Sequence, residues 1–216
     1  MTPMTKGVAT RDRIVERAFS IATVDGLSGL TLGRLADDVG MSKSGLFAHF
    51  KSKEELDLAI LDAAVVKFTE IVVKPAIAEP AGEPRVRAIF DRWLTWDRHR
   101  SLPGGCIFMQ LGAELDAHPG PPRDAYVATQ RRWIELLAQA ARIAVAEGHF
   151  RRDLDPELFA LQFHGVVFTY SHAKRVLRDK RAEDFARQSF EALVAGARRA
   201  GQSRAKPARR KSRRVA

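Results

Sequence analysis

The stretch MSKSGLFAHFKSKEEL, residues 41–56, gathers side chains that suit contact with a polyanion. Lys43 and Lys53 supply mobile cations, while Ser42 and Gly45 are small enough to let a helix N-terminus approach a phosphate or a base edge. A protein core would need more aliphatic residues at these positions, and a solvated surface would contain more acids. The mixture therefore predicts an exposed helix that docks into a groove of nucleic acid.

Two short helices must position this segment. Thr31 can cap a helix that reaches Val39, Gly40 permits a tight turn, and Ser42 can cap a second short helix that ends near His49. Helices joined in this way match the helix-turn-helix motif. The sequence SKEE at Ser52 is a capping box, so a further helix is expected to begin directly behind the motif.

The remaining chain is predicted to be helical nearly throughout, because apolar residues recur at three- and four-residue spacing and strand alternation is absent. We expect an all-α fold of about nine helices, near residues 11–24, 31–39, 42–49, 52–74, 84–99, 107–117, 124–147, 156–172 and 185–197. The expected domains are a helix-turn-helix head at 1–52, a helical effector-binding and dimerisation domain at 53–200, and a basic tail at 201–216.

The formal charge of +10 is concentrated at the C-terminal end. Nine of the 36 basic residues lie between Arg198 and Ala216, where no acid occurs, so the rest of the chain has 36 − 9 = 27 bases against 26 acids. That segment has almost no large apolar residues and is expected to be disordered. It could act as a solubilising tail or as an arm that attracts phosphates without reading sequence.

The chain contains one cysteine, which excludes an intrachain disulfide, and no run approaches the roughly 18 apolar residues of a membrane span. We expect a cytoplasmic protein. Cys106 could sense oxidants or could simply pack. The six histidines lack the close spacing of zinc ligands, so neither a metal nor a cofactor is expected.

The segment TLGRLADDVGMSKSGLFAHFKSKEEL resembles the DNA-binding head of the TetR/AcrR family of transcriptional regulators. The resemblance covers about residues 11–61, and EGHFRRDLDPELFA, residues 147–160, resembles the family's link between its seventh and eighth helices. The DNA-binding residues that we assign from the resemblance and the motif are Thr31, Ser42, Lys43, Ser44, Gly45, Phe47, His49 and Lys53. Where Phe47 stands the family usually has tyrosine, so a hydroxyl–phosphate bond is missing, although Phe47 can still touch a thymine methyl or a sugar. His49 could instead hydrogen-bond within the head.

The resemblance also implies an effector pocket and a homodimer built from the last two helices. The pocket residues that we expect are Trp93, Trp96, Phe108, Met109, Gln110, Trp133, Phe163, His164 and Phe168. Each aromatic residue among them could equally be ordinary core. The dimer-interface residues that we expect are Leu161, Val167, Phe185, Phe190, Leu193 and Val194.

The function implied is that of a dimeric transcriptional regulator, expected to be a repressor that a largely apolar small molecule releases from double-stranded operator DNA. Two alternatives remain open at the level of sequence. One is a constitutive nucleoid-type DNA binder in which the basic tail dominates. The other is a small helical enzyme that uses Cys106 or His164, although no paired base and nucleophile is visible.

Overall fold

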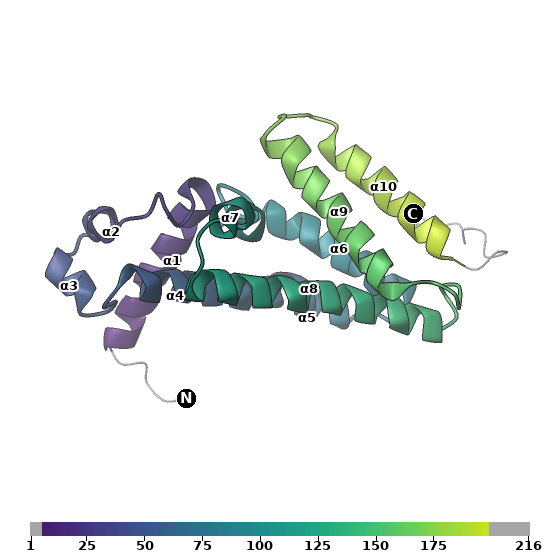
Figure 1. The fold of residues 1–216 in the computed structure, drawn as a ribbon, viewed down its shortest axis with the longest axis horizontal. Helices are drawn as coiled ribbons and strands as arrows, with labels where there is room; N and C mark the ends of the chain where they lie inside the picture. The colour runs from purple at the N-terminus through teal and green to yellow at the C-terminus, as the bar shows by residue number, and fades with distance from the viewer. Residues whose placement is uncertain (1–5, 199–216) are drawn as a thin grey trace, which may run out of the picture.

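The computed structural model describes residues 6–198 of the 216-residue chain, and within that range every regular element is a helix (Figure 1). The head consists of α1 (Lys6–Asp25), α2 (Leu32–Asp38) and α3 (Lys43–Phe47). The body contains α4 (Lys53–Phe68), the π-helical segment η1 (Thr69–Val73), α5 (Lys74–Ile77), α6 (Glu83–Asp97), α7 (Ile107–Asp116), α8 (Pro121–Ala146), α9 (Pro156–Arg175) and α10 (Ala182–Ala197). The predicted all-α fold is confirmed.

The expected helix starts are explained by their caps. The side chains of Thr31, Ser42 and Ser52 accept hydrogen bonds from backbone amides three residues ahead, at the starts of α2, α3 and α4. Asp155 caps α9 and Pro156 follows at the first helical position. Gly40 has φ +68, the left-handed conformation that lets the chain reverse between α2 and α3.

The prediction that the fourth helix ends near Pro75 is wrong. α4 continues through η1 into α5, so the three segments form one helical rod from residue 53 to residue 77. A proline ring presses on the carbonyl four residues back in a regular α-helix. Here the turn before Pro75 is wider, since the Lys74 amide donates to the Thr69 carbonyl five residues back. With this rod counted once, the described residues contain the nine helices expected.

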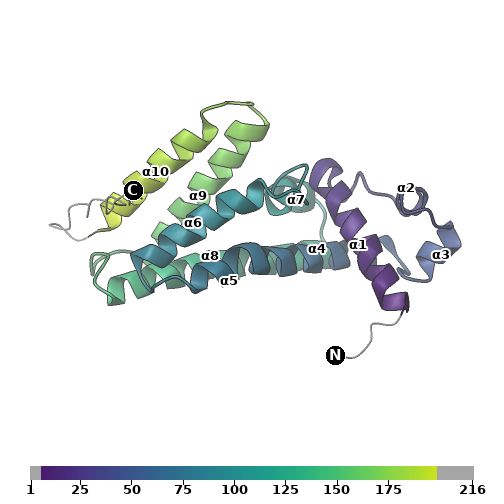
Figure 2. The same ribbon diagram turned by 180° about the vertical axis from the view of Figure 1, so that it is seen from behind.

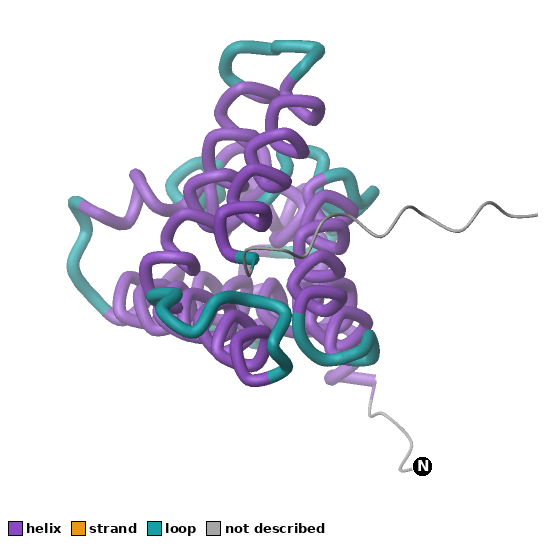
Figure 3. Tube along the Cα trace, turned by 90° about the vertical axis from the view of Figure 1, so that its right-hand side faces the viewer, coloured by secondary structure: helices purple, strands orange, loops and turns teal. Residues whose placement is uncertain are grey.

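The head occupies one end of an elongated molecule, and the rod of α4, η1 and α5 runs from it beneath the body (Figures 1 and 2). α4 packs against both α1 of the head and α8 of the body. α9 packs against α8 and α10, and Figure 3 shows the α9–α10 pair rising above the other helices when the molecule is viewed from one end.

The body core is rich in stacked aromatic rings. The rings of Phe90 and Phe190 lie parallel with their centroids 4.1 Å apart, and Phe163 meets both edge to face. All three side chains are buried. Such pairs add to the stability from area burial, so this cluster fixes α6, α9 and α10 to one another.

The C-terminal basic segment lies outside the described residues from 199 onward. Arg198, which the charge count assigned to the tail, belongs to the folded body. Its guanidinium binds both carboxylate oxygens of Glu83 at the start of α6, and Glu83 also accepts from Arg87. Residues 6–198 contain no helix with the length and apolar character needed to cross a bilayer.

Candidate functional site: DNA-binding head and ligand cavity

The α3 helix presents small polar residues at the far end of the head. The Ser42 hydroxyl accepts from the Gly45 amide at 3.0 Å and lies 3.1 Å from the Ser44 hydroxyl, and both serines are exposed. Beneath them, Leu46 and Phe50 are fully buried in the core, and α3 packs against α2. The buried side anchors the helix while its opposite side remains open to a large partner.

Phe47 is the apolar exception on this surface. Its side chain is 49% exposed, in contrast to Leu46 beside it. A large exposed aromatic next to a cation and two hydroxyls fits contact with a sugar or a base methyl. The sequence predicted that Phe47 lies on an exposed helix, and its side chain is exposed in the structure.

The two lysines of the motif differ in their partners. The Lys53 ammonium binds the Asp57 carboxylate one turn along α4, and burial raises the pKa of Asp57. The Lys43 ammonium has no carboxylate partner among residues 6–198. The Lys43 ammonium is therefore free to bind a phosphate. The Lys53 ammonium must either break its ion pair with Asp57 or bind the phosphate and Asp57 at the same time.

The other two assigned head residues have different surroundings. Thr31 is exposed, and its hydroxyl oxygen accepts from the Arg34 amide at 3.2 Å. His49 is half-buried, and within the described range its ring forms no hydrogen bond. Phe50 lies inside the head with the Arg11 guanidinium 4.6 Å from its ring centre.

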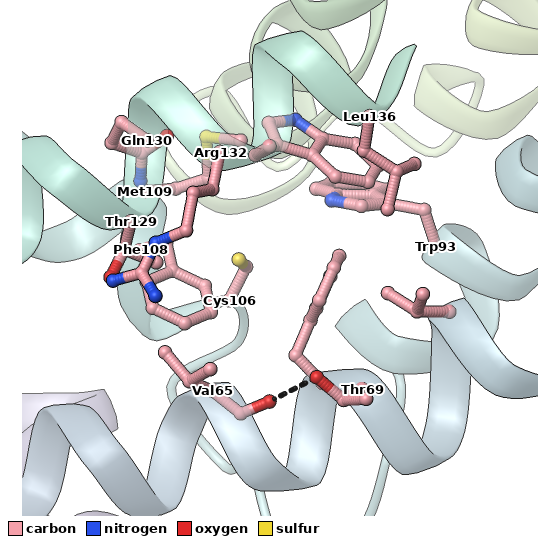
Figure 4. A pocket seen from close by; sticks show the side chains of 13 residues that line it. Val65, Thr69, Trp93, Cys106, Phe108, Met109, Thr129, Gln130, Arg132 and Leu136 are labelled. Carbon is pink, nitrogen blue, oxygen red and sulfur yellow. Dashed lines mark hydrogen bonds between the residues drawn. The ribbon is translucent and has the colours of Figure 1, made fainter. Parts of the chain in front are cut away.

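A cavity of about 270 Å³ lies in the body between the rod, α6, α7 and α8 (Figure 4). Of the residues that the sequence assigned to a pocket, Trp93, Phe108, Met109 and Trp133 line it. The rest of its wall is formed by Val65, Phe68, Thr69, Val73, Cys106, Thr129, Gln130, Arg132 and Leu136.

Five residues expected in the pocket do not line this cavity. Trp96 is fully buried behind the wall, where its indole N–H donates to the Cys106 sulfur at 3.3 Å. Phe163 belongs to the aromatic core, and Phe168 is 54% exposed on α9. His164 accepts from the indole N–H of Trp133, and burial lowers its pKa. Gln110 is exposed and faces the head.

Cys106 is a buried thiol on the cavity wall. Burial raises its pKa to about 11, so the sulfur is protonated at neutral pH. Because the thiolate is the reactive form, the cavity holds no activated nucleophile. Within the described part of the chain, no group of three or more side chains suitable as metal ligands occurs either.

A polar joint connects α7 to the head. The Glu114 carboxylate accepts hydrogen bonds from the Leu27 amide at 3.0 Å and from the amide and hydroxyl of Ser28. One turn earlier, the Gln110 side chain donates to the Val24 carbonyl at 3.1 Å. These contacts tie α7, which also supplies Phe108 and Met109 to the cavity, to the end of α1.

The loop before α7 completes this joint. The Gly104 amide donates to the buried hydroxyl of Thr23, and a Cβ added at Gly104 would lie 1.5 Å from the Thr23 carbonyl oxygen. The neighbouring Asp97 carboxylate is fully buried and binds the Lys174 ammonium of α9 at 2.7 Å. The joint therefore connects the head, the cavity wall and α9.

The outer surface of α9 and α10 carries apolar side chains that face away from the body. Leu158, Leu161 and Phe168 on α9 are each more than half exposed, and Phe185 on α10 is 40% exposed. Of the interface residues expected from sequence, Leu161 and Phe185 lie on this surface. Three others do not, because the chain folds them inward: Val167, Phe190 and Val194 are buried in the protomer. Leu193 is half-buried against the core.

Comparison with known proteins agrees with this architecture. Residues 14–60 match the model for bacterial regulatory proteins of the tetR family, and residues 82–190 match the model for a tetracyclin repressor-like C-terminal domain. The repressor KstR2 of Mycobacterium tuberculosis is 27% identical over 157 residues, 68% of this chain and 72% of that protein. The repressor AcnR of Corynebacterium diphtheriae is 33% identical over 132 residues, 53% of this chain and 68% of that protein.

Solved structures share the same arrangement. A TetR transcriptional regulator from Chloroflexus aurantiacus superposes with a TM-score of 0.81 at 25% identity, covering 91% of this chain and all of that one. AibR, solved with isovaleryl coenzyme A and operator DNA, gives a TM-score of 0.66 at 23% identity over 86% of this chain and 96% of its own. The two matched models together span the head and most of the body, so the chain belongs to the TetR family of bacterial transcriptional regulators.

Proposed function

We propose that this protein is a homodimeric repressor that binds double-stranded operator DNA through α3 and releases it when a small molecule enters the cavity. The observation that carries the proposal is that α7 contacts both sites: Phe108 and Met109 line the cavity, while Gln110 and Glu114 bind the head. The related proteins named as repressors, and the complex of AibR with a ligand and operator DNA, support it.

The DNA contacts proposed are the eight residues assigned above, of which Thr31, Ser42, Lys43, Ser44 and Phe47 are exposed. The Lys53 ammonium binds Asp57, so a phosphate of DNA must compete with the Asp57 carboxylate for it. A dimer would present two α3 helices about one helical turn of DNA apart, roughly 34–36 Å. We propose that the exposed apolar surface of α9 and α10 forms the dimer contact.

The mechanism proposed is a shift between two head positions. A ligand that presses on Phe108 or on the rod at Phe68 and Thr69 would favour a spacing of the two heads that does not match the operator. Both routes lead to the head, one through the Glu114 contact and one through α4, which packs on α1. The protein is proposed to act in the cytoplasm and to have no catalytic activity; the protonated state of the buried cavity thiol supports the second proposal.

The test is DNase footprinting on the DNA upstream of the protein's own gene, with the full chain. A regulator protects one short segment that has two-fold symmetry. Even coating of the fragment at all concentrations would instead support the nucleoid-type alternative, in which the basic segment 199–216 dominates binding.

A further inference from the structure

We infer that the cavity selects an apolar ligand of about two-ring size that carries a carboxylate, with Arg132 as the residue that binds the carboxylate. The inference names the class of ligand for the cavity of the proposed function. It rests on the proposed function only for the claim that ligand binding releases DNA. The geometry of the cavity itself carries the choice of ligand class.

The charge of the wall is the first observation. Arg132 is the one charged residue among the thirteen that line the cavity, and no acid accompanies it. Its Nε–H donates to the Ala128 carbonyl within α8, and no carboxylate among residues 6–198 pairs with its guanidinium. The nearest acid on its own helix, Glu135, binds Arg142 instead. Arg132 is exposed, as its neighbour Arg131 is, and its positive charge at the edge of an apolar cavity favours an anion and disfavours a cation.

The hydrogen-bonding capacity of the wall points the same way. The Trp93 side chain is 1% exposed, yet its indole N–H has no acceptor within the described part of the chain, and Trp93 faces the cavity from the side opposite Arg132 (Figure 4). The hydroxyls of Thr69 and Thr129 already donate to backbone carbonyls. Apart from the Gln130 amide, which can both donate and accept, the free groups are the nitrogen donors of Arg132 and Trp93, and a carboxylate is a group that only accepts.

The size and surface of the cavity set the apolar part of the ligand. Four rings, those of Phe68, Trp93, Phe108 and Trp133, line the cavity together with the aliphatic side chains of Val65, Val73 and Leu136. An apolar cavity of roughly 150 Å³ is known to hold one benzene ring. The volume here, about 270 Å³, suits a flat body of about two fused rings. A ring of aromatic faces could also hold a quaternary ammonium group, and Arg132 is the feature that argues against that alternative.

The experiment is isothermal titration calorimetry on the full chain without DNA, with three probes that share one naphthalene body. They are 2-naphthoate, 2-naphthamide and 2-naphthylmethylamine, which differ in carrying a carboxylate, a neutral amide or an ammonium group. We expect the carboxylate to bind about ten-fold more tightly than the amide, as for a charge-assisted hydrogen bond. We expect the amine to bind least.

The deciding variant is Arg132→Gln, which should bind the carboxylate and the amide equally while its affinity for the amide stays unchanged. Arg131→Gln is the matched control, because Arg131 is the next residue on α8, is exposed, and does not line this cavity. It removes the same charge and should keep the ten-fold preference. A second variant, Trp93→Phe, keeps a ring but removes the indole donor opposite Arg132, and the ten-fold preference for the carboxylate should remain.

Three results would overturn the inference: equal binding of carboxylate and amide by the unmodified chain, tighter binding of the amine, or no binding of any probe at millimolar concentration. The outcome is separable from the fate of the proposed function. If 2-naphthoate binds through Arg132 but never changes DNA affinity, the ligand class stands and the regulatory role fails. If another compound releases the DNA while carboxylate preference is absent, the regulatory role stands and the ligand class fails.

Discussion

Cys106 shows how the environment of one residue decides between two interpretations of the sequence. From sequence alone the thiol could be an oxidant sensor or a packing residue. In the structure it is 3% exposed, it accepts a hydrogen bond from Trp96, and burial raises its pKa to about 11 from an ordinary value of 9.0. The protonated, enclosed sulfur is a packing residue of the cavity wall.

Alkylation of Cys106 should therefore be slow in the folded protein. A pKa raised by about two units lowers the thiolate fraction roughly a hundred-fold at pH 8, and enclosure lowers the rate further. The measurement is the rate of modification by iodoacetamide, native against urea-unfolded, which is clean because the chain has a single cysteine. Comparable rates in the two states would mean that the sulfur is accessible and would revive the sensor interpretation.

Lys43 is expected to bind a phosphate of DNA in each head. Replacing it with alanine should weaken binding to a random duplex and lower the slope of log affinity against log salt by about one per bound head, because one counterion fewer is released. Fluorescence anisotropy at several salt concentrations measures both.

The control for Lys43→Ala is Lys180→Ala. Lys180 is an exposed lysine in the turn between α9 and α10, outside the head. The substitution removes the same charge and should leave the slope unchanged. An equal effect of both variants would mean that overall charge, rather than a contact at α3, governs binding.

The head residues were predictable because the motif is local. Capping by Ser42 and the turn at Gly40 both depend on neighbours a few positions away. The cavity wall was only partly predictable, because periodicity identifies apolar residues but not which of them face an empty volume. Phe68 and Phe163 look alike in sequence, yet one lines the cavity and the other fills the core.

At the scale of elements, α7 links the cavity wall to the head, and the Glu114 carboxylate makes several of the contacts. Glu114→Ala removes the acceptor for the amides of Leu27 and Ser28. Loss of these charge-assisted hydrogen bonds should make local opening easier by about 1–2 kcal/mol, which corresponds to roughly ten-fold faster amide exchange in the link between α1 and α2. Hydrogen–deuterium exchange with mass spectrometry of the peptide spanning residues 24–32 measures it.

Asp116→Ala provides the comparison for this variant, because Asp116 is exposed on the same helix and makes no hydrogen bond or ion pair with the head among residues 6–198. Exchange in the same peptide should remain as in the unmodified chain. If Glu114→Ala also leaves it unchanged, the joint depends on the Gln110–Val24 and Gly104–Thr23 contacts instead.

Element boundaries followed the sequence wherever a cap marks them, as at Ser52 and Asp155. They departed from it at Pro75, where a proline that normally stops a helix is accommodated by η1. No local sequence pattern predicts the π-helical turn η1. This turn packs against α6, a contact between separate elements of the fold. The first helix likewise begins at Lys6 rather than near Arg11.

At the scale of the whole molecule, the inward position of Phe190 makes this residue unsuitable for a mutational test of dimerisation. Phe190 stacks on Phe90, so a charge there would disrupt the protomer rather than an interface. Leu161 is 57% exposed on the outer surface of α9 and is the appropriate position. Leu161→Glu in a homodimer places two carboxylates in one apolar contact, which should cost several kcal/mol of association free energy.

Light scattering coupled to size exclusion should then give a dimer for the unmodified chain and a monomer for Leu161→Glu. Ile77→Glu is the matched control, because Ile77 is 53% exposed on α5, away from α9 and α10. It should remain dimeric. A Leu161→Glu variant that remains dimeric would place the contact on another surface.

The separation between the cavity residues on α8 and the head contacts of α7 can be used in protein engineering. Five of the residues that line the cavity, Thr129, Gln130, Arg132, Trp133 and Leu136, belong to α8, whereas the head is held by α7 and the loop before it. Residues that choose the ligand are thus largely separate from residues that transmit its presence. A library that varies the α8 positions while keeping Gly104, Gln110 and Glu114 could redirect the protein to new inducers, making it a starting point for genetically encoded biosensors.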